Sequence, residues 1–196
     1  MANADIVRGA VLVGHALGAG FTARVRRYLH PSSDGTAVFM GDFVKSGGTA
    51  DSVTGLPTII QAAATDTLRG VVVGFDKVDG VAIGSTNLSA NHCPASTAMY
   101  VHVCDDPYAV FEIQEDAVTA CTALIDIGEN ADIIVAAGNT TTGLSGMELD
   151  SSDHKTATAQ LRILGFSQKV DNTPASDHAK LLVMINEHEL KSTSGV

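Results

Sequence analysis

Short runs of alternating apolar and polar side chains are the main pattern along this chain of 196 residues. Residues 99–104 read Met-Tyr-Val-His-Val-Cys, and residues 110–115 alternate in a similar way. A period of two predicts strands with one buried face and one face in contact with water. Residues 71–73 are three consecutive valines, which predicts a strand buried on both faces or a tight barrel wall.

Further strands are predicted where apolar runs lie between Gly, Pro, Ser and Asp turn signals. These strands are 11–13, 25–29, 36–44, 59–64, 68–78, 133–136, 147–149, 160–166 and 180–186. We expect Gly41-Asp42 to interrupt strand 36–44 and Ser46-Gly47-Gly48 to end it. We expect residues 79–96 to form a long polar connection. Asp116 and the apolar spacing up to residue 127 favour one short helix.

Four short sequence motifs occur twice in the same order, 80 to 91 residues apart. Asp42-Phe43-Val44, Thr54-Gly55-Leu56, Gly74-Phe75 and Pro94-Ala95-Ser96 return as Asp132-Ile133-Ile134, Thr142-Gly143-Leu144, Gly165-Phe166 and Pro174-Ala175-Ser176. Repeated motifs that keep their order but vary in spacing are typical of a duplicated unit of paired strands. The alternative is that turns in any β-rich chain reuse these residue types.

These patterns predict a mainly β fold, a β-sandwich or a jelly-roll-like β-barrel, with at most one or two short helices. We expect two similar halves at about 38–104 and 129–186 within a β domain of residues 31–190. Residues 1–30 would form an N-terminal arm and the first strand, and residues 191–196 a surface tail.

The composition is that of a folded protein without a membrane span. With 45% hydrophobic and 17% charged residues, the chain can bury one good core or two small ones. No run of about 18 apolar residues is present, and the N-terminus does not resemble a signal peptide. We therefore expect synthesis in the cytoplasm and no membrane partner.

The charge is uneven along the chain. Of the 12 basic and 22 acidic residues, 4 and 1 lie within residues 1–30, so the remaining 8 and 21 make the rest strongly acidic. Such a body is repelled by phosphates, which argues against a nucleic-acid partner. The basic N-terminal region favours contact with an acidic surface, although a partly exposed strand explains the arginines equally well. The candidate contacts with a partner or with another subunit are Arg8, Arg24, Arg26, Arg27 and Tyr28.

Candidate metal and catalytic motifs fail on spacing. His92-Cys93 with His102 and Cys104 is the densest group of metal-ligating types, but it lacks a standard zinc spacing. The glycine-rich stretch 9–20 lacks the Lys-Ser or Lys-Thr ending of a phosphate loop, and 143–146 is one residue short of a nucleophile elbow. We predict no catalytic residue, no metal and no cofactor, so the chain is not expected to be an enzyme.

Six stretches resemble a family of head decoration proteins, also called capsid cement proteins, of tailed bacteriophages. They are residues 28–37, 41–45, 94–100, 130–132, 138–146 and 160–165. The resemblance extends over about residues 25–190. It implies a structural virion protein on the capsid exterior that binds and stabilises the lattice of the major capsid protein, as a dimer or trimer. The alternative is a virion-borne host-attachment module or hydrolase that uses the loop 79–96.

Overall fold

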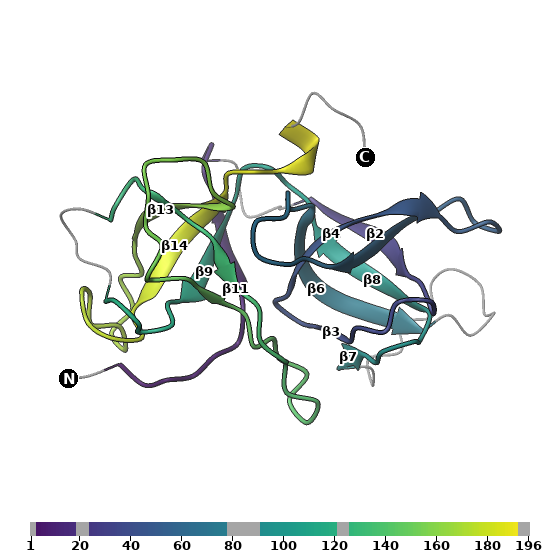
Figure 1. The fold of residues 1–196 in the computed structure, drawn as a ribbon, viewed down its shortest axis with the longest axis horizontal. Helices are drawn as coiled ribbons and strands as arrows, with labels where there is room; N and C mark the ends of the chain where they lie inside the picture. Colours follow the sequence, from purple (N-terminus) through teal and green to yellow (C-terminus); the bar gives the residue numbers. More distant parts are fainter. Residues whose placement is uncertain (1–2, 19–23, 78–90, 121–125, 192–196) are drawn as a thin grey trace.

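Strands and the turns between them make up nearly all of the fold. The structure is a computed structural model that describes residues 3–18, 24–77, 91–120 and 126–191. Two β units lie side by side (Figure 1), and the helical element among the described residues is the single short turn η1, Glu189–Lys191. The mainly β fold expected from the alternating pattern is therefore confirmed.

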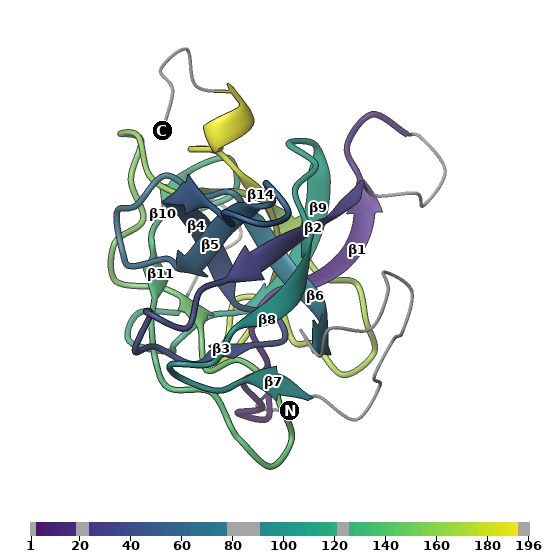
Figure 2. The same cartoon turned by 90° about the vertical axis from the view of Figure 1, so that its right-hand side faces the viewer.

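The first unit is a closed barrel with the strand order β2-β5-β4-β6-β8. Its strands are β2 (Val25–His30), β4 (Phe43–Ala50), β5 (Pro57–Gln61), β6 (Gly70–Lys77) and β8 (Met99–Cys104). The short strands β3 (Val38–Phe39) and β7 (His92–Cys93) pair at one end of the barrel (Figure 2). Met99, Val101 and Val103 are buried in its interior, whereas Tyr100 and His102 are half-buried, as the alternation in β8 predicts.

The second unit is a five-stranded sheet with the order β1-β9-β14-β13-β10, joined by a two-stranded sheet of β11 and β12. Its strands are β1 (Val11–His15), β9 (Ala109–Gln114), β10 (Asn130–Ala131), β11 (Ile133–Ile134), β12 (Glu148–Leu149), β13 (Leu161–Phe166) and β14 (Lys180–Ile185). A parallel bridge from Leu149 to Glu115 places β12 beside the end of β9.

The two units share their order of strand pairing. In the first unit β2 pairs with β8, β8 with β6, β6 with β4, β4 with β5, and β5 with β2 in parallel. In the second unit β9 pairs with β14, β14 with β13, β13 with β10, and β11 with β12, and the parallel bridge places β12 beside the end of β9. β9, β14 and β13 thus correspond to β2, β8 and β6, while β10 and β11 together correspond to β4, and β12 corresponds to β5. In both, the repeated Gly-Phe dipeptide follows a register shift, between Val72 and Gly74 in β6 and between Ile163 and Gly165 in β13.

The predicted strand 36–44 is interrupted at Gly41-Asp42, as expected, but its predicted end is wrong. β3 ends at Phe39, Gly41 has a φ of +91°, and β4 begins at Phe43. β4 then continues through Gly47-Gly48, which we expected to end it. A Cβ atom on Gly47 would lie 2.6 Å from Thr58 Oγ1, so this glycine allows the close approach of β5 instead of ending the strand.

Strand β9 also differs from the prediction, because it is buried on both faces except at Val110. Its polar residues Glu112 and Gln114 are covered by the N-terminal segment, and the local alternation gives no sign of this cover. The predicted helix at 116–127 falls partly outside the described residues. Its described parts, 116–120 and 126–127, form bends, turns and irregular chain.

One hydrophobic core joins the two units. Phe43, Val71 and Cys104 point out of the first barrel and pack in the same cluster as Phe111 and other residues of the second unit. The rings of Phe43 and Phe111 meet edge to face at 6.4 Å between centroids. Because the cluster is continuous across the junction, we expect the two units to hold a fixed relative position.

Candidate binding surface

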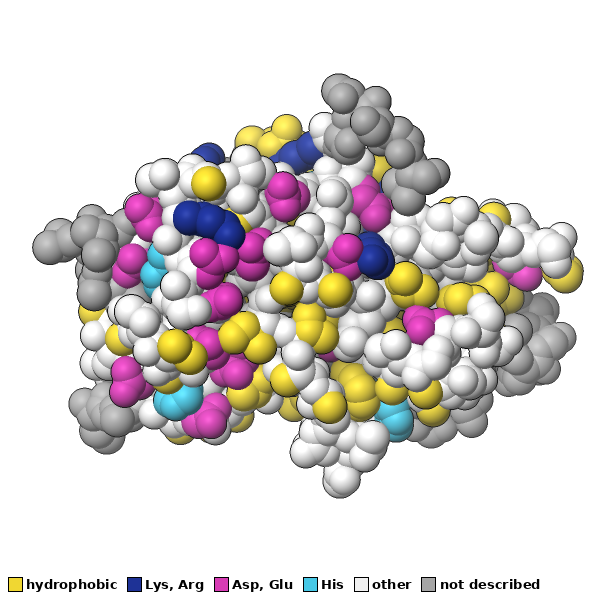
Figure 3. All heavy atoms as spheres, in the orientation of Figure 1, with side chains coloured by type: hydrophobic (Ala, Val, Ile, Leu, Met, Phe, Trp, Pro, Cys, Tyr) yellow, Lys and Arg dark blue, Asp and Glu magenta, His cyan; other side chains and the backbone are white. Residues whose placement is uncertain are grey.

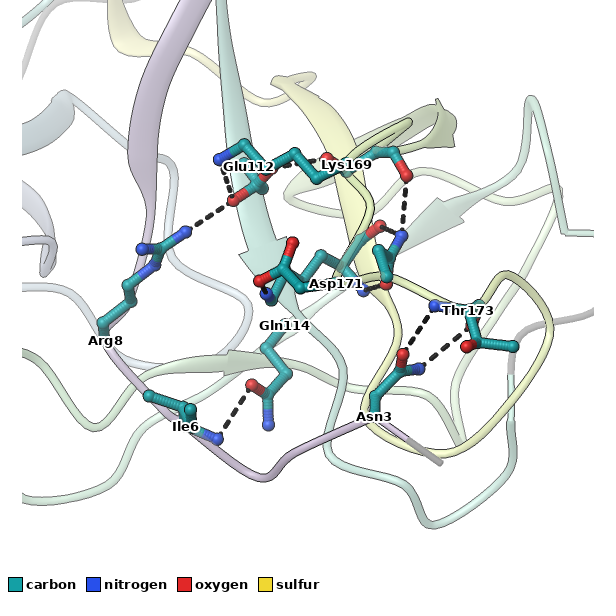
Figure 4. A network of polar contacts seen from close by, with 11 residues as sticks. Asn3, Ile6, Arg8, Glu112, Gln114, Lys169, Asp171 and Thr173 are labelled. Carbon is teal, nitrogen blue, oxygen red and sulfur yellow. Dashed lines mark hydrogen bonds and ion pairs between the residues drawn. The ribbon is translucent and has the colours of Figure 1, made fainter. Parts of the chain in front are cut away.

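A polar network fixes the N-terminal segment, residues 3–9, on the second unit (Figure 4). The Asn3 side-chain amide donates to the carbonyl oxygen of Thr173 at 3.0 Å, and its Oδ1 accepts the Thr173 backbone N–H at 2.6 Å. The Ile6 backbone N–H donates to Gln114 Oε1 at 3.1 Å. The segment therefore runs across strand β9 and the loop before β14 in a defined position.

Glu112 on β9 is the centre of this network. Its carboxylate accepts hydrogen bonds from Arg8 Nη2 at 2.6 Å, Lys169 Nζ at 2.9 Å and Ser167 Oγ at 2.6 Å. Burial by itself would raise the pKa of Glu112, but the hydrogen bonds from Ser167 and Lys169 and the charges of Lys169 and Arg8 bring it below its ordinary value. Arg8, a predicted contact residue, thus neutralises a buried carboxylate while 37% of its side chain remains exposed.

An open apolar groove of about 300 Å³ lies where the N-terminal chain crosses the junction of the two units. It is lined by Arg8, Ala10, Val11, Leu12, Met40, Gly41, Val72, Val73 and Leu144. One wall is strand β1, an edge strand that pairs only with β9 among the described strands. An apolar groove beside an edge strand is suited to contact with another chain.

Two glycines allow the chain crossing at the base of this groove. Gly9 has a φ of +69° and Gly41 a φ of +91°, and a Cβ atom on either would lie 2.5 Å from a backbone oxygen of the other segment. The Ala10 N–H donates to the Gly41 carbonyl at 2.9 Å, and the Gly41 N–H donates to the Val72 carbonyl at 2.9 Å. Only residues without a side chain let these three segments pack so closely.

The other predicted contact residues lie on or next to β2, on the first barrel. Arg24 is exposed, and Arg26 Nη1 is 3.3 Å from Asp105 Oδ2. The Arg27 guanidinium lies 4.5 Å from the centroid of the Tyr100 ring. Arg8 is on the second unit, so the five predicted residues do not form one group.

Tyr28 differs from these arginines because it is only 2% exposed. Its hydroxyl donates to Asp105 Oδ2 at 2.6 Å and accepts from Arg69 Nε at 3.0 Å. Burial and the hydrogen bond to Asp105 raise its pKa above the ordinary value. The side chain of Tyr28 therefore stabilises the barrel interior and presents almost no surface to a partner, and its contact role stays a prediction.

The densest group of histidines and cysteines in the sequence does not converge in the structure. His102 Nε2 pairs with Asp76 Oδ2 at 2.7 Å, and Cys104 is buried at the junction of the units. Cys93 is fully buried with its Sγ 3.3 Å from His30 Nδ1. Burial raises the pKa of Cys93 to about 12, which leaves a neutral thiol rather than a nucleophile.

One further group of side chains has no signal in the sequence. Within the described residues, the group of three or more metal-ligating types that lie close together is Asp5, Glu148 and His178. These residues are far apart along the chain and show no spacing motif, so only the folding of three segments onto one another brings them together.

Comparison with known proteins adds no relative. No family model matches the chain, no similar curated protein was found, and no solved structure matches the fold. Among the described residues there is no helix long and apolar enough to cross a membrane.

Proposed function

We propose that this protein is a structural component of a tailed-phage virion that binds the outer surface of the capsid and stabilises the lattice of the major capsid protein. The observation that carries the proposal is the open apolar groove beside the edge strand β1, on a scaffold whose two units share one core. The six sequence stretches that resemble decoration proteins support the same function.

The architecture is suited to that task. A rigid scaffold loses little conformational entropy on binding, so weak contacts yield more net affinity. Contacts repeated at every symmetry-related position of a shell add avidity, and closed symmetry favours a dimer or trimer. Acidic side chains gather over the second unit on the face drawn in Figure 3, which agrees with a body directed away from DNA.

The test is to mix the purified protein with capsids that lack it, count the bound copies per shell, and follow the temperature at which the capsids rupture. We expect saturable binding in a multiple of the lattice symmetry and an upward shift of the rupture temperature. Failure to bind both intact and expanded capsids would contradict the proposal. Binding to host cells in place of capsids would favour the attachment alternative.

A matched pair of variants tests the groove. Met40 lies at the groove with 37% of its surface exposed, whereas Val53 is 89% exposed in a loop outside it. Met40→Glu places a charge in the apolar groove, and we expect at least about tenfold weaker capsid binding. Val53→Glu adds the same charge elsewhere and should bind as the wild type does. Equal binding by both variants would exclude the groove as the contact.

A further inference from the structure

Three metal-ligating side chains from distant segments meet next to the N-terminal segment. Asp5 belongs to that segment, Glu148 to β12, and His178 to the loop between β13 and β14. One ligand atom of each lies within 4.8 Å of the other two, and Asp5 Oδ1 is 3.9 Å from His178 Nδ1. Two carboxylates and one imidazole form a donor set that suits a borderline divalent metal such as Zn²⁺.

Glu148 differs from its neighbouring carboxylates in the hydrogen bonds that stabilise its negative charge. Its Oε1 is buried and has no hydrogen-bond partner among the described residues. Glu115 accepts the backbone N–H groups of Ala117 and Ala179, and Asp116 accepts the N–H of Ser151 at 3.0 Å. Backbone N–H groups thus stabilise the negative charges of Glu115 and Asp116. Among the described residues, no hydrogen-bond donor does the same for Glu148 Oε1.

The electrostatic surroundings of Glu148 are unfavourable for a free carboxylate. Burial, followed by the charges of Asp5 and Asp116, raises the pKa of Glu148 to about 7. The neighbouring His178 opposes this rise. A cation bound at this point would offset both the burial and the repulsion.

We propose that Asp5, Glu148 and His178 bind a divalent transition-metal cation of the Zn²⁺ type. Glu148 and Asp5 each supply a carboxylate oxygen, His178 supplies a ring nitrogen, and water completes a four-coordinate site. Because Asp5 lies in the N-terminal segment, the cation links this segment to β12 and to the loop before β14. This inference does not depend on capsid binding.

Small movements are sufficient to form the site. Tetrahedral zinc places its ligand atoms roughly 3.4 Å apart, so the side chains must approach one another by about 1 Å. Asp5 is exposed, so its side chain can change rotamer without displacing a packed neighbour. Gln114 Nε2 donates to Asp5 Oδ1 at 3.1 Å and lies 3.3 Å from His178 Nδ1, and the cation would take the place of this amide between the two side chains.

The experiment is a calorimetric titration of the full chain, without an affinity tag and freed of metal by a chelator, with Zn²⁺. Co²⁺ is then added in a second titration, because its visible absorption reports four-coordinate binding. Glu148→Gln, His178→Gln and Asp5→Asn are compared with the wild type. The matched control is His15→Gln, since His15 Nε2 lies 3.3 Å from the single carboxylate of Asp106.

We expect one Zn²⁺ per chain, with at least about tenfold weaker binding in each site variant and unchanged binding in His15→Gln. Asp5→Asn changes an exposed residue, so it provides a readout even if a variant of the less exposed ligands fails to fold. No Zn²⁺ binding by the wild type would overturn the proposal. So would binding that Asp5→Asn leaves unchanged, or that His15→Gln weakens as much as the site variants do.

Discussion

At the scale of single residues, His188 is a neutral histidine held in the protein interior. It is 2% exposed, its Nδ1 accepts the Leu190 N–H at 3.0 Å, and its Nε2 has no hydrogen-bond partner within the described residues. Burial, followed by the charges of Lys191 and Arg69, lowers its pKa to about 4, against a smaller opposite effect of Asp106. Protonation is therefore much easier in the unfolded chain.

This difference predicts a loss of stability in mild acid. The unfolded chain takes up the proton below about pH 6.5, whereas the folded protein resists it down to about pH 4. The free energy of unfolding should fall across this window, by up to about 3 kcal/mol from His188. Chemical denaturation at pH 7 and pH 4.5 measures the fall.

A pair of histidine variants identifies the residue responsible. His188→Gln should show a smaller fall between the two pH values than the wild type. His92→Gln, which alters a histidine stacked on Phe39 at 5.1 Å, should keep the full fall. An equal fall in the wild type and in His188→Gln would show that another group carries the pH dependence.

At the scale of elements, the two halves contain the same six-residue loop, at 51–56 and 139–144. In each loop the first N–H donates to the last carbonyl, and the N–H of the glycine donates back to the first carbonyl. The glycines, Gly55 and Gly143, have φ values of +70° and +76°. Asp51 or Asn139 at the first position accepts backbone N–H groups through its side-chain oxygen.

We predict that the two loops respond alike to loss of this side-chain acceptor. Asn139→Ala removes the hydrogen bonds to the N–H groups of Thr141 and Thr142 and should lower the free energy of unfolding by about 1 kcal/mol. Asp51→Ala should likewise lower the unfolding midpoint. Thermal unfolding measures both. Asp51→Asn and Asn139→Asp keep the acceptor and serve as controls. Opposite effects of the two alanine variants would show that the loops are not equivalent.

At the scale of the whole molecule, the shared core makes the two units depend on each other. Phe43 is fully buried, begins a strand of the first barrel, and contacts Phe111 of the second unit. Phe43→Ala should lower the free energy of unfolding by about 3–5 kcal/mol. Calorimetry should show one transition in the wild type and in the variant, because unfolding of either unit would expose the apolar cluster that joins them.

Val53→Ala is the control for this prediction, since Val53 is 89% exposed and its loss should change stability by about 0.5 kcal/mol or less. Two separate transitions in the wild type, of which Phe43→Ala shifts only the first, would mean that the units fold independently.

The sequence by itself determined the mainly β character of the fold and the place of several strands. These features depend on neighbours within a few residues, so the local sequence was enough to locate them: the alternation along β8, the valine run in β6, and the recurring Gly-Phe and Thr-Gly-Leu motifs. The interruption at Gly41-Asp42 was predicted, but the end of the strand at Gly47-Gly48 was wrong because Gly47 allows the close approach of Thr58, which is distant in sequence.

The tertiary structure decided which segments meet. Only folding brings the N-terminal segment over β9, so the sequence could not show that Glu112 and Gln114 would be buried, or that Asp5 would approach Glu148 and His178. Folding also buried Tyr28, whose neighbours Arg26 and Arg27 on the same strand are half-buried. Alternation specifies the two faces of a strand, but contacts between distant segments decide what covers each face.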